Sequence, residues 1–354
     1  MEDDDVKCNG TFATLDGHTE HIGSAVMNPS GERVASTSND GTVRIWDVAS
    51  GRQLACLVGT DIGNAAWDPS GRKLAAVFYD GGVMRIWDAE SCQEEATFKG
   101  VDGYTVAWSP CGTKVVARSS NRTDCVVWGA GTSQELARLI GHASEIDYVA
   151  WSKDGRRLYT TSMDHTARVW DAASGEQLVC LEGHADWVHA VRPNPDDTKL
   201  ATSSLDGTVR VWDAASGKEL RCFLASRDDI RSVAWSPDGT KLASLSDDQT
   251  VRVWGVATGE ELLCIRDVPV VASIVAVVSW SADGKRLITL SGITHFAMRY
   301  WDAVSGKELA CLTPPHALSA RWIRSVRRNA SRTVVTYAHK KTVVVWRPYD
   351  DPNA

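Results

Sequence analysis

The stretch RSVAWSPDGTKLASLSDDQTVRVWGVATGEELLCI, residues 231–265, decides the fold of this chain. It holds four short runs rich in Val, Leu, Ile and Trp, which are separated by Pro-Asp-Gly, Asp-Asp-Gln-Thr and Ala-Thr-Gly. Turn residues that recur about every 8–12 residues between β-forming runs are typical of an antiparallel meander. The stretch therefore predicts four strands joined by tight turns.

The same unit recurs along the chain and is marked by a tryptophan at the end of its third run. The intervals between these tryptophans are 41, 41, 42, 42, 42, 47 and 45 residues. A period of about 40–45 residues indicates the four-stranded blades of a propeller. The tryptophans that mark the units are Trp46, Trp87, Trp128, Trp170, Trp212, Trp254, Trp301 and Trp346.

The units also carry two dipeptides at fixed places. Trp-Asp stands at 46–47, 87–88, 170–171, 212–213 and 301–302, and Gly-His at 17–18, 141–142 and 183–184. On these motifs the sequence resembles the WD-repeat β-propeller family over nearly its whole length. Trp128 and Trp254 are followed by Gly and Trp346 by Arg, so those units depart from the pattern. The resemblance implies an all-β propeller that serves protein–protein interaction.

The number of blades follows from the ends of the chain. Seven units are followed by a fourth run, and the eighth is not, whereas TFATLDGH at residues 11–18 looks like a fourth run without a unit before it. We therefore expect an eight-bladed WD-repeat β-propeller whose ring is closed by the N-terminal strand, which leaves no exposed edge. Seven blades plus an appended hairpin is the alternative. The expected domains are an acidic tail at 1–10, one propeller at 11–348 and a C-terminal tail at 349–354.

Charge and composition exclude several classes of partner. The 354 residues carry a net charge of −7, so the chain lacks the basic footprint of nucleic-acid-binding proteins. No apolar run approaches the about 20 residues that span a bilayer. With its acidic start, MEDDDVKCNG, the sequence predicts an intracellular protein, cytoplasmic or nuclear, without membrane contact. The nine cysteines show no C-x-x-C spacing, so we expect no metal site.

A polar set recurs at equal offsets in units one, four and five. Ser, His and Asp are the components of a nucleophilic triad, but three copies at the repeat phase indicate a structural role. We expect Asp to orient the imidazole, the imidazole to bond serine, and serine to bond the indole N–H. No catalytic residue and no cofactor is predicted. The network residues are His18, Ser38, Asp40, Trp46, His142, Ser162, Asp164, Trp170, His184, Ser204, Asp206 and Trp212.

Trp187 and Trp322 stand in the loop just before the first run of their units, where other units carry His21 or Asp229. The fold requires no indole there, and tryptophan is enriched among interface hot spots. The family resemblance implies that these loops form a binding mouth, so we expect a peptide or loop of another protein to bind there. The candidate partner-binding residues are Trp187, Trp322, Leu205, Met163, Glu145, Asp147, His189, Asp229, Arg231, Arg324, Tyr104 and His21.

Two further segments are unusual. The stretch 309–349 contains no Asp or Glu and eight Lys or Arg residues. This basic sector predicts pairing either with the acidic residues 2–5 or with an acidic or phosphorylated partner segment. The apolar loop 267–275 is three residues longer than its counterpart in unit six. Its sequence is compatible both with a partner contact and with packing on the propeller.

Two alternative functions stay open beside the interaction scaffold. AASGKEL is similar to the docking segment of quinoprotein dehydrogenases, but RCF or ACL follows it without the docking tryptophan. A propeller hydrolase would need a unique carboxylate pair, whereas the acidic residues here mostly recur at the repeat phase. Substrate adaptors of ubiquitin ligases usually carry Arg or Lys one residue after Trp-Asp, and WDVAS, WDAES, WDAAS and WDAVS show none. The sequence therefore favours a binding protein over an enzyme.

Overall fold

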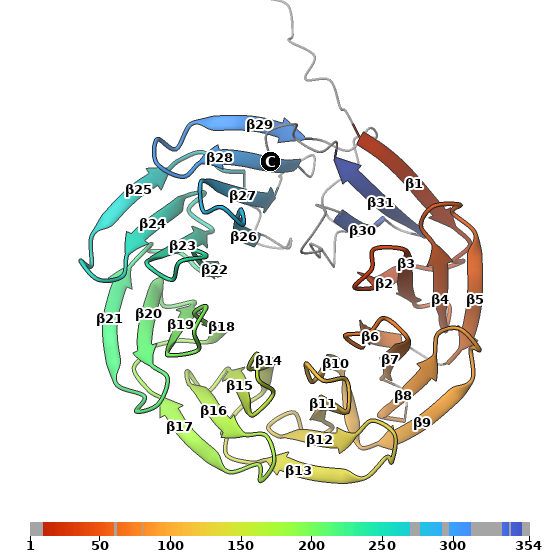
Figure 1. Cartoon of the computed structure of the whole chain (residues 1–354). Helices are drawn as coiled ribbons and strands as arrows, with labels where there is room; N and C mark the ends of the chain where they lie inside the picture. Colours follow the sequence, from red (N-terminus) through yellow and green to blue (C-terminus); the bar gives the residue numbers. More distant parts are fainter. Residues whose placement is uncertain are drawn as a thin grey trace, which may run out of the picture. The chain divides into compact units, whose positions relative to one another are not determined.

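The computed structural model describes residues 10–59, 62–79, 81–269, 277–291, 297–312, 335–339 and 341–348, which form β-strands and no helix (Figure 1). The strands are β1 (Gly10–Asp16), β2 (Ile22–Met27), β3 (Arg33–Ser38), β4 (Thr42–Asp47), β5 (Gln53–Val58), β6 (Ile62–Trp67), β7 (Lys73–Phe78), β8 (Val83–Asp88), β9 (Glu94–Lys99), β10 (Val101–Trp108), β11 (Lys114–Ser119), β12 (Cys125–Gly129), β13 (Glu135–Leu139), β14 (Ile146–Trp151), β15 (Arg157–Ser162), β16 (Ala167–Asp171), β17 (Gln177–Leu181), β18 (Val188–Pro193), β19 (Lys199–Ser204), β20 (Thr208–Asp213), β21 (Glu219–Leu224), β22 (Ile230–Trp235), β23 (Lys241–Ser246), β24 (Val251–Gly255), β25 (Glu261–Ile265), β26 (Val277–Trp280), β27 (Arg286–Ser291), β28 (Ala297–Asp302), β29 (Glu308–Leu312), β30 (Val335–His339) and β31 (Thr342–Pro348).

These strands form eight sheets. Sheets one to seven each take four consecutive strands, from β2–β5 in sheet one to β26–β29 in sheet seven, and each is a meander. Sheet eight has the order β1-β31-β30 among the described residues. These sheets confirm the four-stranded units predicted from the tryptophan period. Each tight turn joins strands that are neighbours in sequence.

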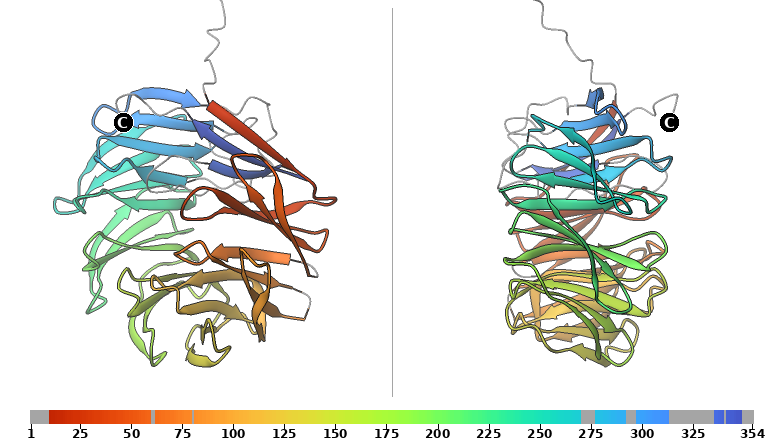
Figure 2. Two further views of the ribbon diagram at one scale, coloured as in Figure 1. Left: turned by 45° about the vertical axis from the view of Figure 1, so that its right-hand side comes forward. Right: turned by 90° about the vertical axis from the view of Figure 1, so that its left-hand side faces the viewer.

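β1 completes sheet eight, as the sequence predicts. It pairs antiparallel with β31 from Gly10↔Pro348 to Asp16↔Thr342, and the Thr342 hydroxyl donates to the Asp16 carboxylate at 2.7 Å. Figure 2 shows the red β1 beside the dark-blue β31. The edge of β31 that a missing fourth strand would expose is therefore paired.

The chain divides into two compact units. The described residues of the first unit lie within 161–168 and 179–321, and those of the second within 10–160, 169–178 and 322–354. β18–β29, which form sheets five to seven, belong to the first unit.

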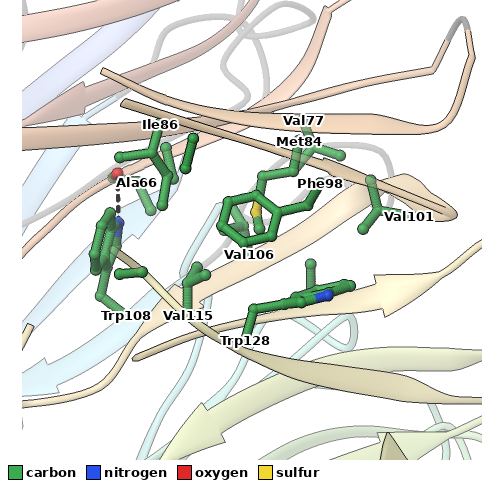
Figure 3. Close-up of a cluster of buried hydrophobic side chains, with 14 of the residues drawn as sticks. Ala66, Val77, Met84, Ile86, Phe98, Val101, Val106, Trp108, Val115 and Trp128 are labelled. Atoms are coloured by element: carbon green, nitrogen blue, oxygen red, sulfur yellow. Dashed lines mark hydrogen bonds between the residues drawn. The ribbon is translucent and has the colours of Figure 1, made fainter. Parts of the chain in front are cut away.

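Within each unit, first-strand tryptophans tie a sheet to the one before it. In Figure 3 the Trp108 indole N–H donates to the Ala66 carbonyl, at 3.0 Å. Around this bond Met84 and Phe98 of sheet two pack with Trp128 of sheet three. The same bond recurs at 2.9–3.2 Å in the pairs Trp67–Val26, Trp151–Ala107, Trp235–Arg192 and Trp280–Ala234. The second strands are almost wholly buried, whereas the fourth strands alternate between buried and exposed residues.

Candidate functional site

The first strand of sheet five contains a β-bulge at its start. Val188 pairs with Ser204 and Ala190 with Ser203, so His189 is the extra residue of β18 at this register shift. The same register shift occurs after Ile22 in sheet one and after Ile230 in sheet six. A bulge re-aims the side chain that it carries. Alternation of apolar residues in the sequence does not reveal an extra residue of this kind.

A backbone hydrogen bond joins each leading loop, the loop before a first strand, to the turn between the second and third strands. In sheet five the Leu205 N–H donates to the Trp187 carbonyl at 3.0 Å. The equivalent bonds are Asn39 to His21 at 2.8 Å and Asp247 to Asp229 at 3.0 Å. In sheet five this bond joins two of the predicted partner-binding residues, Trp187 and Leu205.

Trp187 packs its indole against the bulge. Its ring lies 4.7 Å from the His189 ring, centroid to centroid, at an interplanar angle of 42°. Trp187 is half-buried, and its backbone N–H donates to the Asp186 carboxylate at 2.7 Å. The indole Nε1 is buried and has no hydrogen-bond partner among the residues that the structure describes. The indole therefore packs on its own sheet without a hydrogen bond to any described residue.

In sheet six an ion-pair cluster occupies the same positions. Arg231 at the bulge donates from Nε and Nη2 to Asp247, at 3.0 and 2.6 Å, and its Nη2 lies 3.0 Å from Asp229. The hydrogen bonds to Asp247 raise the pKa of Arg231 although burial opposes the shift. Two carboxylates thus surround one guanidinium, so Arg231 is not available as a free cation.

Backbone hydrogen bonds connect the turn of sheet five that contains Leu205 to the leading loop of sheet six. The Ala225 and Ser226 N–H groups, which precede Asp229, both donate to the Gly207 carbonyl in the turn after Leu205, at 3.0 and 3.1 Å. Gly207 has φ +76°, and a Cβ there would lie 2.4 Å from the Ser226 carbonyl oxygen, so only glycine fits. We call Trp187, His189, Leu205 and Asp229 the Trp187 surface.

The remaining candidate residues lie elsewhere or outside the described residues. His21 is exposed, and Glu145 pairs with Arg122 at 3.1 Å in the second unit, where Asp147 is half-buried. Met163 is half-buried in the turn between β15 and β16. That Met163, Glu145 and Asp147 surround Trp187 stays a prediction. The Tyr104 side chain, Trp322, Arg324, most of the apolar loop 267–275 and most of the basic sector lie outside the described residues.

The polar network is present, but the hydroxyl that links the imidazole to the indole belongs to a different residue from the predicted serine. In sheet five the His184 Nδ1 lies 2.9 Å from the Asp206 carboxylate and its Nε2 lies 2.7 Å from Thr202 Oγ1. The Trp212 N–H donates to the same Thr202 oxygen at 2.8 Å. Sheet one repeats this with Ser36 between His18 and Trp46, and sheet four places Thr160 between His142 and Trp170.

The prediction that Ser38, Ser162 and Ser204 link imidazole to indole is therefore wrong. Trp46 pairs with Val34, which makes Ser36 its diagonal neighbour on the same face and places Ser38 two residues too far along β3. Ser38 instead donates to the Glu20 carbonyl at 3.2 Å and accepts from the Asp40 N–H. Ser204 makes the equivalent bonds to Asp186 and Asp206. These serines fix the leading loop and the turn.

Acid is expected to weaken the network of sheet one in two stages. Burial lowers the pKa of His18 below its ordinary 6.5. Burial favours a raised pKa for Asp40, but hydrogen bonds from Thr42, the Thr19 N–H and His18 outweigh it and lower that pKa to about 2. Because the unfolded chain binds both protons more tightly, stability falls as the pH drops below 6.5, and again from 3.8 towards 2.

Urea unfolding from about pH 8 to pH 2 measures this dependence. His18→Gln is expected to reduce the loss of unfolding free energy below pH 6.5, and Asp40→Asn the loss between pH 3.8 and 2. A His18→Gln variant whose free energy of unfolding keeps the wild-type slope below pH 6.5 would contradict the assignment to His18.

Cys111 is expected to react with alkylating agents near neutral pH. It is exposed, and hydrogen bonds with Ser109 and Thr113 lower its pKa to about 7, whereas burial raises the pKa of Cys125 to about 12. The thiolate is the nucleophile. Peptide mass spectrometry after brief treatment with iodoacetamide should find Cys111 modified at least roughly ten-fold faster than Cys125. Ser109→Ala should slow the reaction, and an unchanged rate would contradict this origin of the reactivity.

The described residues contain no group of three or more His, Cys, Asp or Glu side chains placed to hold a metal ion. They also contain no helix that is long and apolar enough to cross a membrane.

Comparison with known proteins relates these features to a family. Residues 9–47, 133–171, 175–213 and 217–255 match the model described as WD domain, G-beta repeat. Coronin-7 of Mus musculus is 44% identical over 72 residues, which cover 20% of this chain and 8% of that protein. The ribosome biogenesis protein BOP1 homolog of Drosophila virilis is 39% identical over 57 residues, 16% of this chain and 7% of that protein. The chain thus matches less than a tenth of the length of these relatives.

A solved structure resembles the chain over almost its whole length. The computationally designed Ika8 protein superimposes with a TM-score of 0.75 at 22% sequence identity, and the match covers 95% of this chain and 98% of that one. At this identity the likeness shows the fold alone. Together with the matched segments, three of which include a Gly-His dipeptide, it confirms the predicted resemblance. The chain contains WD40 repeats, and its all-β fold of repeated four-stranded sheets is that of a WD-repeat β-propeller.

Proposed function

We propose that the chain is a protein-interaction scaffold that binds a peptide or loop of a partner protein at the Trp187 surface. Its WD40 repeats support an interaction role. The observation that carries the assignment to this surface is Trp187 itself, a half-buried indole in a leading loop where equivalent loops hold His21 or Asp229. Tryptophan is one of the residue types that are enriched among interface hot spots.

The unpartnered indole N–H supports a binding role over a packing role. A buried donor without an acceptor costs about 1–3 kcal/mol, and Trp187 Nε1 is such a donor among the described residues. A residue retained for stability would gain from an acceptor in its own sheet. A partner that moves the ring from His189 can supply that acceptor, so binding adds a hydrogen bond to the apolar contact.

The wider set of predicted contacts stays part of the proposal. It extends the Trp187 surface to Met163, Glu145, Asp147 and Arg231 as neighbours, and places the chain in the cytoplasm or the nucleus. The expectation of an acidic or phosphorylated partner at the basic sector stays a prediction, as do the domain boundaries at residues 10 and 348.

Affinity purification with quantitative mass spectrometry tests the proposal. Wild type, Trp187→Ala and Leu262→Ala are compared in a lysate of cells that make the protein. Leu262 is the matched control because it is an apolar residue, 47% exposed, on β25 of the same unit. We expect specific partners to be lost with Trp187→Ala and kept with Leu262→Ala. Partners that both variants retain would contradict the assignment to this surface.

A further inference from the structure

We infer that the partner segment is basic, with a lysine or arginine next to an apolar side chain. The apolar side chain contacts Trp187 and Leu205, and the cation pairs with Asp229 and the exposed carboxylates near it. This inference rests on the proposed function, since it names the chemistry of the segment that binds the Trp187 surface.

The apolar and acidic parts of this surface form one continuous region. Leu205 is bonded through its N–H to the Trp187 carbonyl, and Gly207 in the same turn accepts from Ala225 and Ser226. Asp228 and Asp229 follow Ala225 and Ser226 in the leading loop of sheet six. The strands behind them are also joined, because the Trp235 indole N–H donates to the Arg192 carbonyl at 2.9 Å. A short peptide that contacts Trp187 therefore lies within reach of these carboxylates.

Carboxylates outnumber cations in these loops and turns. The leading loop of sheet five, EGHADW at 182–187, has two acidic residues and neither Lys nor Arg. The leading loop of sheet six, ASRDD at 225–229, has two aspartates and one arginine, and Asp247 and Asp248 form the adjoining turn. Because Arg252 pairs with Asp248 at 3.2 Å, the acidic residues that remain are Glu182, Asp186, Asp228, Asp229 and Asp247, against Arg227 and Arg231.

Arg231 does not cancel this excess. It is shared between Asp247 and Asp229, so the three groups together carry one net negative charge. The Asp229 side chain is 33% exposed and that of Asp247 15%, which leaves Asp229 as the accessible carboxylate of the cluster. Asp186 and Asp228 are exposed as well. Charge complementarity steers association and selects the partner, while the apolar contact supplies most of the affinity.

Selection from a phage library of random dodecapeptides tests the inference while the natural partner is still unidentified. The library is selected on wild type, and each selected peptide is then measured against Trp187→Ala. Peptides that lose affinity on this variant define the ligands of the Trp187 surface. We expect them to be enriched in Lys or Arg beside an apolar residue, and to bind more weakly as the salt concentration rises.

Two isosteric variants separate a local charge from the general charge of the protein. Asp229→Asn is expected to weaken those peptides about five-fold. Glu260→Gln removes the same charge from an exposed turn between β24 and β25, and should leave their binding unchanged.

The outcomes distinguish the two proposals. Ligands that depend on Trp187 but are neutral or acidic would overturn the basic partner and leave the proposed function standing. Equal losses with Asp229→Asn and Glu260→Gln would also overturn it, because the effect would then come from net charge. If no selected peptide depends on Trp187, the proposed function fails and the inference fails with it.

Discussion

Replacing Trp187 with alanine is expected to weaken partner binding by about 2 kcal/mol or more, roughly a thirty-fold rise in Kd, while the melting temperature changes little. The indole supplies a large apolar contact, so its truncation removes the anchor of the interface. Stability should be spared because Trp187 is half-buried and its indole N–H makes no hydrogen bond to any residue that the structure describes. Isothermal titration calorimetry with a selected peptide, alongside thermal unfolding, measures both effects.

A second substitution guards against an indirect effect of Trp187→Ala. His189→Ala removes the ring against which the indole packs but keeps the indole. We expect it to weaken binding less than Trp187→Ala does, since the anchor remains. If Trp187→Ala lowers the melting temperature markedly and leaves Kd unchanged, Trp187 belongs to the packing and the site is wrong.

Thr202→Val is expected to lower the free energy of unfolding by about 2 kcal/mol or more, although it conserves the shape of the side chain. The Thr202 hydroxyl bonds both His184 Nε2 and the Trp212 N–H, so its removal leaves two buried polar groups without their partner. Each such group costs about 1–3 kcal/mol. Urea unfolding of wild type and variant gives the difference directly.

The neighbouring Ser203 is the control for this measurement. It is wholly buried in the same strand, and its hydroxyl has no hydrogen-bond partner among the described residues. Ser203→Ala should therefore be neutral or stabilising, because it removes an unpaired buried group. Equal losses for Thr202→Val and Ser203→Ala would show that the hydroxyl does not link the network.

A double-mutant cycle tests whether the network acts as a unit. His184→Ala and Asp206→Ala should each destabilise the protein by about 1–3 kcal/mol, and their combined loss should be less than the sum of the two. Additive losses would contradict the shared network that the 2.9 Å contact between the two side chains implies.

The repeat period is sufficient to predict the sheets, because each meander is built from turns between strands that are adjacent in sequence. The missing fourth run of unit eight also predicts the pairing of β1 with β31. Which residue of a strand makes a given contact is harder to predict from the sequence. Ser36 and Ser38 share one face of β3 by the two-residue alternation, so the sequence identifies the face and not which hydroxyl the indole reaches.

The candidate site shows the same limit. Alignment of the units places Trp187, His189 and Leu205 at positions of the mouth. The contact of Trp187 with His189 depends on a bulge, which changes the register of β18 and leaves no trace in the apolar pattern. The ion pairs of Arg231 with Asp229 and Asp247 cannot be predicted from the sequence either. The three residues are up to 18 positions apart and meet only across β22 and β23.

The pairing of β1 with β31 has a consequence for the rate of folding. The two strands join residues 10–16 to residues 342–348, and the Thr342–Asp16 bond closes a separation of 326 residues. Contacts between residues so far apart in sequence form slowly, because the intervening chain must first be ordered. During synthesis β1 has no strand to pair with until β31 has been made up to residue 348, while sheets one to seven can form one after another. Until that step is complete, β31 presents an open edge to which the β1 segment of a second molecule can add.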